Sequence, residues 1–373
     1  MESPRSVMPS GRGRPALGFG RITACLTTSL VVTLVAGCGI ETRVVTASPF
    51  GQQPAVVSVT PPTQSTDRPS PPPTSTPSSS TAPAVASTAP APAVAAFSAT
   101  RSSLRLTEPR SRAVAFAFGS QVFLAGGLTA SGTTDSIVAL SPNRAVRVAG
   151  TLRAAVHDAG GTTLGTVAYV FGGGRFGPGS AVQRIDPTGQ VAVVGRLPAI
   201  RADLAAVTVG SRMFVVGGGT PSRMDDLVLS TTDGRAFRDA GHLRVPVRYP
   251  AVVASGPRIY VIGGVTPGGD TAAVQVVDTG TGRVAIVGSL PHGLSHATAF
   301  VLGETVLLAG GRSGGRAQDG LWRLDEARGS FVRIGRLPYA VSDAAAVTLD
   351  GTAYLIGGEG RTLLASVIAI SAR

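Results

Sequence analysis

A double glycine that ends a short apolar run occurs six times in this 373-residue sequence. In the first copy, the apolar residues Phe123–Ala125 precede the pair. The six pairs are Gly126 and Gly127, Gly172 and Gly173, Gly217 and Gly218, Gly263 and Gly264, Gly310 and Gly311, and Gly357 and Gly358. Successive first glycines lie 46, 45, 46, 47 and 47 residues apart. A fixed period of this size predicts a repeat architecture.

Each repeat has the pattern of four short strands. In the third repeat, the apolar runs 204–209 and 213–216 are joined by a turn at Gly210, and the runs 227–230 and 236–240 are joined by a turn at Asp233. Regular short strands separated by turn residues predict an all-β closed architecture. Because the first two strands are almost continuously apolar, they fit sheets that are covered on both faces. The glycine pairs fit places where another backbone comes close.

The count of strands predicts how the architecture closes. From Arg112 onward the chain supplies five sets of four strands and then a sixth set of three, at 344–349, 352–356 and 366–371. One extra strand, Ser102–Thr107, precedes the first repeat. We expect this strand to complete the last sheet, so that six sheets of four strands form a ring closed by the two ends of the folded chain.

The repeats commonly end in Gly-x-Leu-Pro, as at 195–198 and 288–291. With the glycine pair that ends the second strand and the spacing, this pattern resembles the Kelch-type β-propellers, the superfamily that includes the central domain of galactose oxidase. The resemblance covers about residues 98–373 and implies a six-bladed, all-β propeller. Two features depart from the Kelch pattern. Aliphatic residues such as Leu140 replace the usual Tyr of the third strand, and Phe237 and Phe331 stand where the fourth strand usually has Trp.

The N-terminus has the pattern of an export signal. A basic region precedes the apolar run 26–36 and contains Arg5, Arg12, Arg14 and Arg21. A basic flank with a short apolar core is typical of a secretory signal and is too short for a comfortable membrane span. Residues 34–39 resemble the bacterial lipobox, in which the cysteine, here Cys38, is lipidated. We predict a lipoprotein signal peptide over 1–37 and an anchor at Cys38; an ordinary signal peptide and an uncleaved anchor are the alternatives.

Residues 38–97 change character abruptly. Segments such as Pro69–Pro77 are rich in Pro, Ser and Thr, and they cannot bury enough apolar surface to order themselves. High proline content favours an extended tether. We therefore predict three parts: a signal peptide over 1–37, a disordered tether over 38–97 and a propeller over 98–373. The anchored chain would lie on the extracytoplasmic face of the cell membrane.

The amino-acid composition limits which partners and cofactors the protein can bind. The formal net charge is +12, and all the basic residues are Arg because the sequence contains no Lys. Such a surface favours anionic partners. We expect no nucleic acid, because the sequence shows neither a clustered basic stripe nor a nucleic-acid module. The two cysteines, Cys25 and Cys38, both lie near the N-terminus, so the folded part can hold no disulfide framework or cysteine metal site.

One position of the repeat carries a side chain that can form hydrogen bonds in every copy. Fourteen residues before each first glycine stand Arg112, Asp158, Asp203, Tyr249, His296 and Asp343. A six-fold position should ring one end of the central channel. The loops after the glycines add Asp135, Arg175, Arg223, Arg312, Arg316, Glu359 and Arg361. These residues predict a polar pocket for a sugar or an anionic group. The alternative is that they cap turns and hold channel water, since Asp is a common turn residue.

No known enzyme constellation is complete in the sequence. No cysteine remains near the propeller for the copper site of galactose oxidase, and the histidines show no metal-ligand spacing. We therefore expect no metal and no cofactor. Our first hypothesis is a monomeric module that binds an envelope protein or polysaccharide at the cell surface. The alternative is a carbohydrate-active enzyme resembling the Kelch-type sugar mutarotases, with the channel-end Asp, His and Arg residues as its machinery.

Overall fold

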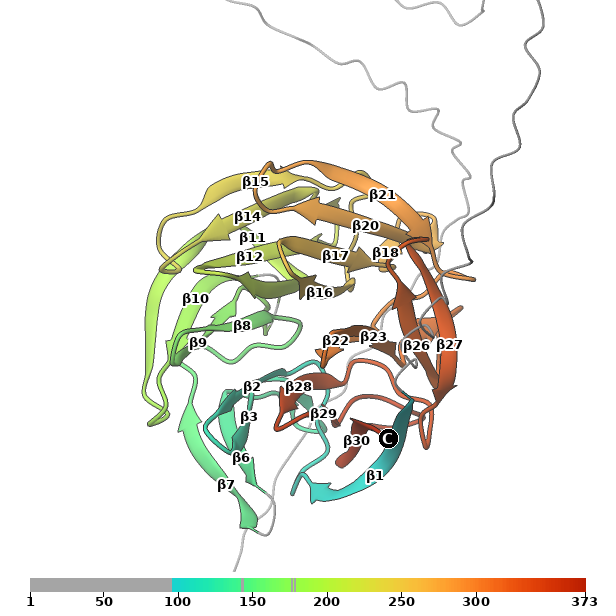
Figure 1. Cartoon of the computed structure of the whole chain (residues 1–373). Coiled ribbons are helices and arrows are strands. Elements are labelled where there is room, and N and C mark those ends of the chain that lie inside the picture. Colours follow the sequence, from blue (N-terminus) through green and yellow to red (C-terminus); the bar gives the residue numbers. More distant parts are fainter. Residues whose placement is uncertain (1–95, 142–143, 176, 178) are drawn as a thin grey trace, which may run out of the picture. The chain divides into compact units, whose positions relative to one another are not determined.

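The computed structural model describes residues 96–141, 144–175, 177 and 179–373. All of these residues belong to one compact unit. The predictions for the signal peptide, for Cys38 and for nearly all of the tether lie outside the described residues. Within them the regular secondary structure consists of strands, with no helix (Figure 1).

Most strands belong to antiparallel sheets of four. The first such sheet contains β2 (Val114–Phe118), β3 (Gln121–Ala125), β6 (Ser136–Ser141) and β7 (Arg144–Thr151). Another contains β16 (Ala251–Ser255), β17 (Arg258–Ile262), β20 (Ala273–Asp278) and β21 (Val284–Ser289). The next contains β22 (Thr298–Leu302), β23 (Thr305–Ala309), β26 (Gly320–Asp325) and β27 (Ser330–Arg336). In each of these sheets, spatial order follows chain order, as the repeat pattern predicts.

The second and third repeats share one eight-stranded sheet, which the sequence did not predict. Its strands are β8 (Gly160–Leu164), β9 (Val167–Phe171), β10 (Gly179–Ile185), β11 (Val191–Val209), β12 (Arg212–Thr220), β13 (Arg223–Met224), β14 (Leu227–Thr231) and β15 (Arg238–His242). The cause is β11, which stays extended through both repeats. Its first part pairs with β10, and its part from Ala202 onward pairs with β12. β11 thus joins two groups of four strands.

Three small hairpins fill loops after glycine pairs. They are β4 (Leu128–Thr129) with β5 (Gly132–Thr133), β18 (Val265–Thr266) with β19 (Gly269–Asp270), and β24 (Arg312–Ser313) with β25 (Arg316–Ala317). The sequence predicted only variable loops there. Each hairpin pairs two residues with two, which is too short to leave a pattern of alternating apolar residues.

The last sheet combines the two ends of the described chain. Its order is β1 (Phe97–Arg105), β30 (Ser366–Ala372), β29 (Thr352–Ile356) and β28 (Ala345–Leu349). The N-terminal strand therefore lies where the strand count placed it, but its bounds differ from the expected 102–107. β1 begins at Phe97, which pairs with Ala372, and it ends at Arg105. Phe97 and Ala99 pack against an apolar cluster of this sheet, which explains the earlier start.

Six apolar clusters form the core, and each contains buried residues of two successive groups of four strands. In β3, for example, Phe123 packs with residues of the following group, whereas Leu124 packs with β29 residues of the last sheet. Successive side chains of a strand point to opposite faces, so one apolar run serves two clusters. Burying one such side chain contributes roughly 1.5–3 kcal/mol. The clusters connect every group to the next one, and the last group to the first.

The glycine pairs lie where one group of strands meets the next. Both glycines of every pair have a positive φ, between 59° and 107°. A Cβ on Gly126 would lie 2.5 Å from the carbonyl oxygen of Val156, in the following repeat. The next residue, Gly127, donates a 2.7 Å hydrogen bond from its N–H to the same oxygen. Gly358, in the last pair, donates in the same way to Arg110, ahead of the first sheet. Only glycine combines this conformation with so close an approach.

Candidate functional site

The six residues of the predicted polar ring share an unusual backbone conformation. Each has a positive φ, between 52° and 60°. Among the described non-glycine residues only one other, Asp350 in a tight turn, shares this property. Left-handed backbone is disfavoured for residues with a side chain, although Asp and His tolerate it better than most. We call the six residues the central ring: Arg112, Asp158, Asp203, Tyr249, His296 and Asp343.

Backbone hydrogen bonds join the central ring into a closed cycle. Each residue donates its N–H to the carbonyl of the ring residue in the preceding repeat; for example, Asp203 donates to Asp158 at 2.8 Å. The cycle ends where Arg112 donates to Asp343 at 3.0 Å. All six bonds measure 2.8 to 3.1 Å. The left-handed conformation therefore aligns the six backbones, and it brings their side chains together at one place.

The central ring lies at one end of a cavity of about 620 Å³. This cavity is lined by the innermost strand of every group, from β2 to β28, and each lining segment begins directly after a ring residue. Most lining side chains are small, such as Ala, Gly, Thr and Val. Thr162 and Thr208 form a 2.9 Å hydrogen bond across two of these strands. Small side chains leave the channel open, and the six ring residues border its end without being among its lining residues.

Arg112 is the centre of an ionic network. Its guanidinium lies 3.1 Å from Asp158, 2.8 Å from Glu359 and 3.8 Å from Asp343. It also lies 6.0 Å from the ring centroid of Tyr249, three positions along the central ring and so opposite to it. Arg112 therefore reaches across the ring, and its side chain is only 20% exposed.

Two further arginines extend the ionic network. Arg312 pairs with Asp343 at 3.1 Å and with Glu359, which also accepts a hydrogen bond from Ser111. Arg248 pairs with Asp203, whose side chain is 3% exposed. We call the central ring together with Arg248, Arg312 and Glu359 the central cluster. Its three arginines each contact at least one carboxylate of the cluster.

Tyr249 and His296 stack with ring centroids 3.9 Å apart. Ser295 donates its hydroxyl proton to Asp270 at 2.7 Å, and it lies 2.8 Å from Nδ1 of His296. Since a hydroxyl has one proton, Nδ1 must donate to Ser295, which leaves Nε2 of the neutral ring as an acceptor. Burial, reinforced by Arg312 and Arg112, lowers the pKa of His296 to about 4. His296 is therefore neutral at physiological pH.

The carboxylates of the cluster divide into two kinds. Burial raises the pKa of Asp158 to about 7 and that of Asp343 to about 6, against the opposing effect of Arg112. Burial also acts to raise the pKa of Glu359. The hydrogen bond and charge of Arg112, together with Ser111 and Arg312, outweigh burial and lower this pKa overall. Asp158 can therefore exchange a proton near neutral pH, whereas Glu359 stays ionised.

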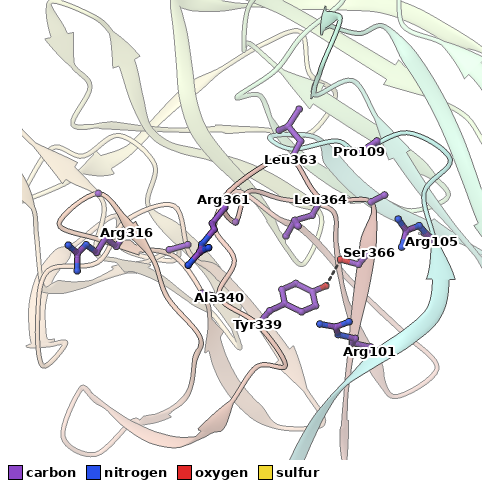
Figure 2. Close-up of a pocket in the computed structure, with 14 residues that line it drawn as sticks. Arg101, Arg105, Pro109, Arg316, Tyr339, Ala340, Arg361, Leu363, Leu364 and Ser366 are labelled. Atoms are coloured by element: carbon purple, nitrogen blue, oxygen red, sulfur yellow. Dashed lines mark hydrogen bonds between the residues drawn. The ribbon is translucent and has the colours of Figure 1, made fainter.

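The predicted loop residues separate into different places. Arg312 and Glu359 lie in the central cluster. The contacts and hollows of the described residues place the others elsewhere. Arg223 pairs with Asp225, and Asp135 and Arg175 line a separate hollow. Arg316 and Arg361 line another (Figure 2).

Several residues of the network were not predicted from the sequence. Five of them directly precede a residue of the central ring: Ser111, His157, Arg248, Ser295 and Ser342. Each forms an isolated bridge to the residue after a glycine pair, which fixes its side chain beside the cluster. A comparison of repeats one position earlier would have found them, because the same period applies.

Neither a metal site nor a membrane span is seen in the described part of the chain. It contains no group of three or more His, Cys, Asp or Glu placed to hold a metal ion. The same residues include no helix with the length and apolar character needed to span a bilayer.

Comparisons with known proteins indicate the fold of this chain. No protein-family model matches the sequence, and no curated protein matches it significantly. Among solved structures, that of YjhT is similar, with a TM-score of 0.59 at 17% identity over 71% of this chain and 96% of the YjhT chain. A similarity at this level of identity concerns the fold alone. It supports an all-β fold of the Kelch-like β-propeller kind.

Proposed function

We propose that this chain is an exported, lipid-anchored, six-bladed Kelch-like propeller that acts as a binding module at the cell surface or in the envelope. The ligand would occupy the end of the central cavity at the central cluster. The partner would be an envelope polysaccharide or protein, bound by a monomer on the extracytoplasmic face of the membrane. Nucleic acid has no part in this proposal.

Three observations support six blades and a closed ring. Apart from β13 and the three small hairpins, the described strands form six groups of four once β11 is divided at the point where its pairing changes from β10 to β12. The core clusters connect each group to the next and the last to the first. The ring of backbone hydrogen bonds passes through one residue of each group and returns to Arg112. The pairing of β1 with β30 would then be the closure that joins both ends of the folded chain.

Export and anchoring rest on the sequence around Cys38. The test is metabolic labelling with a fatty-acid analogue in cells that express wild type or Cys38→Ala. We expect label in the wild type and none in the variant, with the variant released from the membrane fraction. Equal labelling of both proteins would reject the anchor, and a shortened but unlabelled wild type would favour an ordinary signal peptide.

The observation that carries the binding function is the left-handed conformation of all six ring residues. Disfavoured backbone of this kind is kept where the surroundings over-determine it, and it is concentrated at functional sites. Here it gathers carboxylates, an imidazole, a phenol and guanidinium groups at the end of a cavity. Such donors and acceptors, combined with an aromatic face, are suited to a sugar or a sugar acid.

Calorimetric titration of the full-length protein tests this function. The probes are galactose, glucuronic acid and N-acetylneuraminic acid, added to wild type, Asp158→Asn and Tyr249→Phe. We expect at least one probe to bind, and each variant to bind it about tenfold more weakly, because each loses about one hydrogen bond to a buried polar group. Arg235→Gln, an exposed change outside the cluster, should keep the wild-type affinity. Equal affinity in all four proteins would exclude the central cluster as the site.

One observation favours the enzyme alternative. Asp158, with a pKa near 7, could give a proton to the ring oxygen of a bound sugar while Nε2 of His296 takes the proton of the anomeric hydroxyl. The bond between the anomeric carbon and the ring oxygen would break, and reclosure from the other face would return both protons. The test is the rate of anomer exchange measured by NMR. Acceleration by wild type but not by Asp158→Asn would establish catalysis, and no acceleration would leave binding alone.

A further inference from the structure

A second hollow, of about 970 Å³, shares no lining residue with the central cavity or the central ring. It lies beside the last sheet and the hairpin β24–β25 (Figure 2). Its charged lining residues are Arg101 and Arg105 of β1, Arg316 of β25, and Arg361 of the loop between β29 and β30. We call this hollow the arginine pocket. It exists only because β1 pairs with the C-terminal strand, which brings both ends of the fold together.

The four guanidinium groups have no acidic counterparts. The lining includes no Asp or Glu, and within the described part of the chain none of the four arginines forms an ion pair. All four are exposed. Arg101 lies 5.2 Å over the ring of Tyr339, whose hydroxyl donates a 2.7 Å hydrogen bond to Ser366. Four positive charges around one hollow create a positive potential that attracts an anion.

The arrangement of these residues limits the anion. Figure 2 shows Arg316 and Arg361 on one side of Tyr339, and Arg101 and Arg105 on the other. A carboxylate presents two oxygens in one plane, whereas a phosphate presents acceptors in several directions and carries up to two charges. Arginine forks pair with such oxygens two at a time. Arginines on more than one side of the hollow therefore suit the several acceptor directions of a phosphate better than the single plane of a carboxylate.

The rest of the lining indicates that the ligand is larger than the phosphate itself. Tyr339, Leu363 and Leu364 add aromatic and apolar surface. A volume of about 970 Å³ is that of a site for an organic molecule. We propose that the arginine pocket binds the phosphate of an organic phosphate ester, with its carbon skeleton against this apolar side. The ester is either a soluble molecule or a phospholipid headgroup. The site goes beyond the proposed function, since no residue of the central cluster takes part.

Two ligand arms test the proposal on the full-length protein. In the first arm, glycerol 3-phosphate is titrated calorimetrically. In the second, full-length Cys38→Ala, which lacks the proposed lipid anchor, is sedimented with vesicles of phosphatidylcholine alone or with added phosphatidylglycerol. Binding in the first arm would identify a soluble ester, and binding only to vesicles with phosphatidylglycerol would identify a headgroup. Either result supports phosphate recognition. Absence of binding in both arms would overturn it, as would a higher affinity for glucuronate than for glycerol 3-phosphate.

Matched variants locate the binding. Two double variants each remove two charges from one side of the pocket. One combines Arg316→Gln with Arg361→Gln, and the other combines Arg101→Gln with Arg105→Gln. We expect each pair to weaken phosphate binding at least about tenfold, because charge-assisted hydrogen bonds are lost. Arg196→Gln with Arg235→Gln removes two exposed charges elsewhere and should bind as wild type does. Equal losses in all three proteins would show a nonspecific effect of net charge and would overturn the pocket.

A gentler change keeps the test valid if a glutamine variant folds poorly. Arg316→Lys with Arg361→Lys preserves the charge but removes the planar fork. We expect binding weaker than in wild type and stronger than in the glutamine pair. Wild-type affinity in the lysine pair would contradict bidentate recognition. The central-cluster variants Asp158→Asn and Tyr249→Phe should leave phosphate binding unchanged, so this proposal and the proposed function fail independently.

Discussion

The central cluster and the arginine pocket use the same kind of side chain in opposite ways. In the cluster, Arg112, Arg248 and Arg312 are mostly buried, and each is paired with carboxylates of the protein. In the pocket, the arginines are exposed, and no carboxylate among the described residues pairs with them. One region pairs its arginines with its own carboxylates, and the other leaves its arginines unpaired among the described residues.

This difference separates stability from recognition. A buried charge whose partner is removed is strongly destabilising, because it cannot regain its hydration. An exposed charge without a partner costs the fold little, and it stays available to a ligand. The central cluster should therefore affect both folding and binding. The four arginines of the arginine pocket should affect binding alone.

The largest expected effect is that of Arg112→Ala. The change leaves Asp158, Asp343 and Glu359 without their shared cation, and we expect the free energy of unfolding to fall by about 3 kcal/mol. Urea denaturation followed by circular dichroism measures the loss. Arg316→Ala, the matched change in the pocket, should denature at nearly the same urea concentration as wild type. Comparable losses in both variants would remove the distinction between the two regions.

How far the sequence predicts these regions depends on how local the interactions are. The glycine period placed the strands and the central ring, because the interactions that shape Gly126 and Arg112 recur in every repeat. The continuity of β11 was not visible, since nothing in its sequence distinguishes an extended link from a turn. Arg101 and Arg316 come together only through the pairing of both chain ends, so no local pattern could have predicted the arginine pocket.

The pH dependence of stability offers a second test of the central cluster. Burial raises the pKa of Asp158 to about 7, so this group stabilises the fold most when protonated, below about pH 4. Its contribution is lost as the pH rises through 7. Asp158→Asn has no such loss, so relative to wild type its unfolding free energy should increase by about 1–2 kcal/mol between pH 5 and pH 8.

His296 should act in the opposite direction. Its pKa is lowered to about 4, so its contribution is present above about pH 6.5 and is lost as the pH falls towards 4. The unfolding free energy of His296→Gln should therefore rise relative to that of wild type as the solution is acidified. Denaturation series of both variants against wild type, at matched pH values, measure the two slopes. Parallel curves for all three proteins would show that neither group titrates in the buried state described here.

Salt should separate the regions by a smaller effect. The Debye length falls from about 10 Å at 0.1 M to about 3 Å at 1 M salt, and exposed charges are screened far more than buried ones. We expect the affinity of the arginine pocket for glycerol 3-phosphate to fall about tenfold over this range. The difference in stability between wild type and Arg112→Ala should change much less. Sodium chloride series of both measurements, with buffer held constant, provide the comparison.

The smallest expected effect is that of Tyr339→Phe, which tests whether the pocket is also structurally independent. The hydroxyl of Tyr339 bonds Ser366 of β30, so its loss should lower the unfolding free energy by about 1 kcal/mol. The ring itself remains, and with it the surface over which Arg101 lies 5.2 Å from the centroid. Phosphate affinity should therefore stay within about twofold of wild type, since an uncharged hydroxyl adds little beside four guanidinium groups. Calorimetry and urea denaturation on the same sample separate the two quantities. A tenfold loss of affinity without loss of stability would instead make the hydroxyl a direct ligand of the phosphate, and the arginines would then act mainly by attracting the anion.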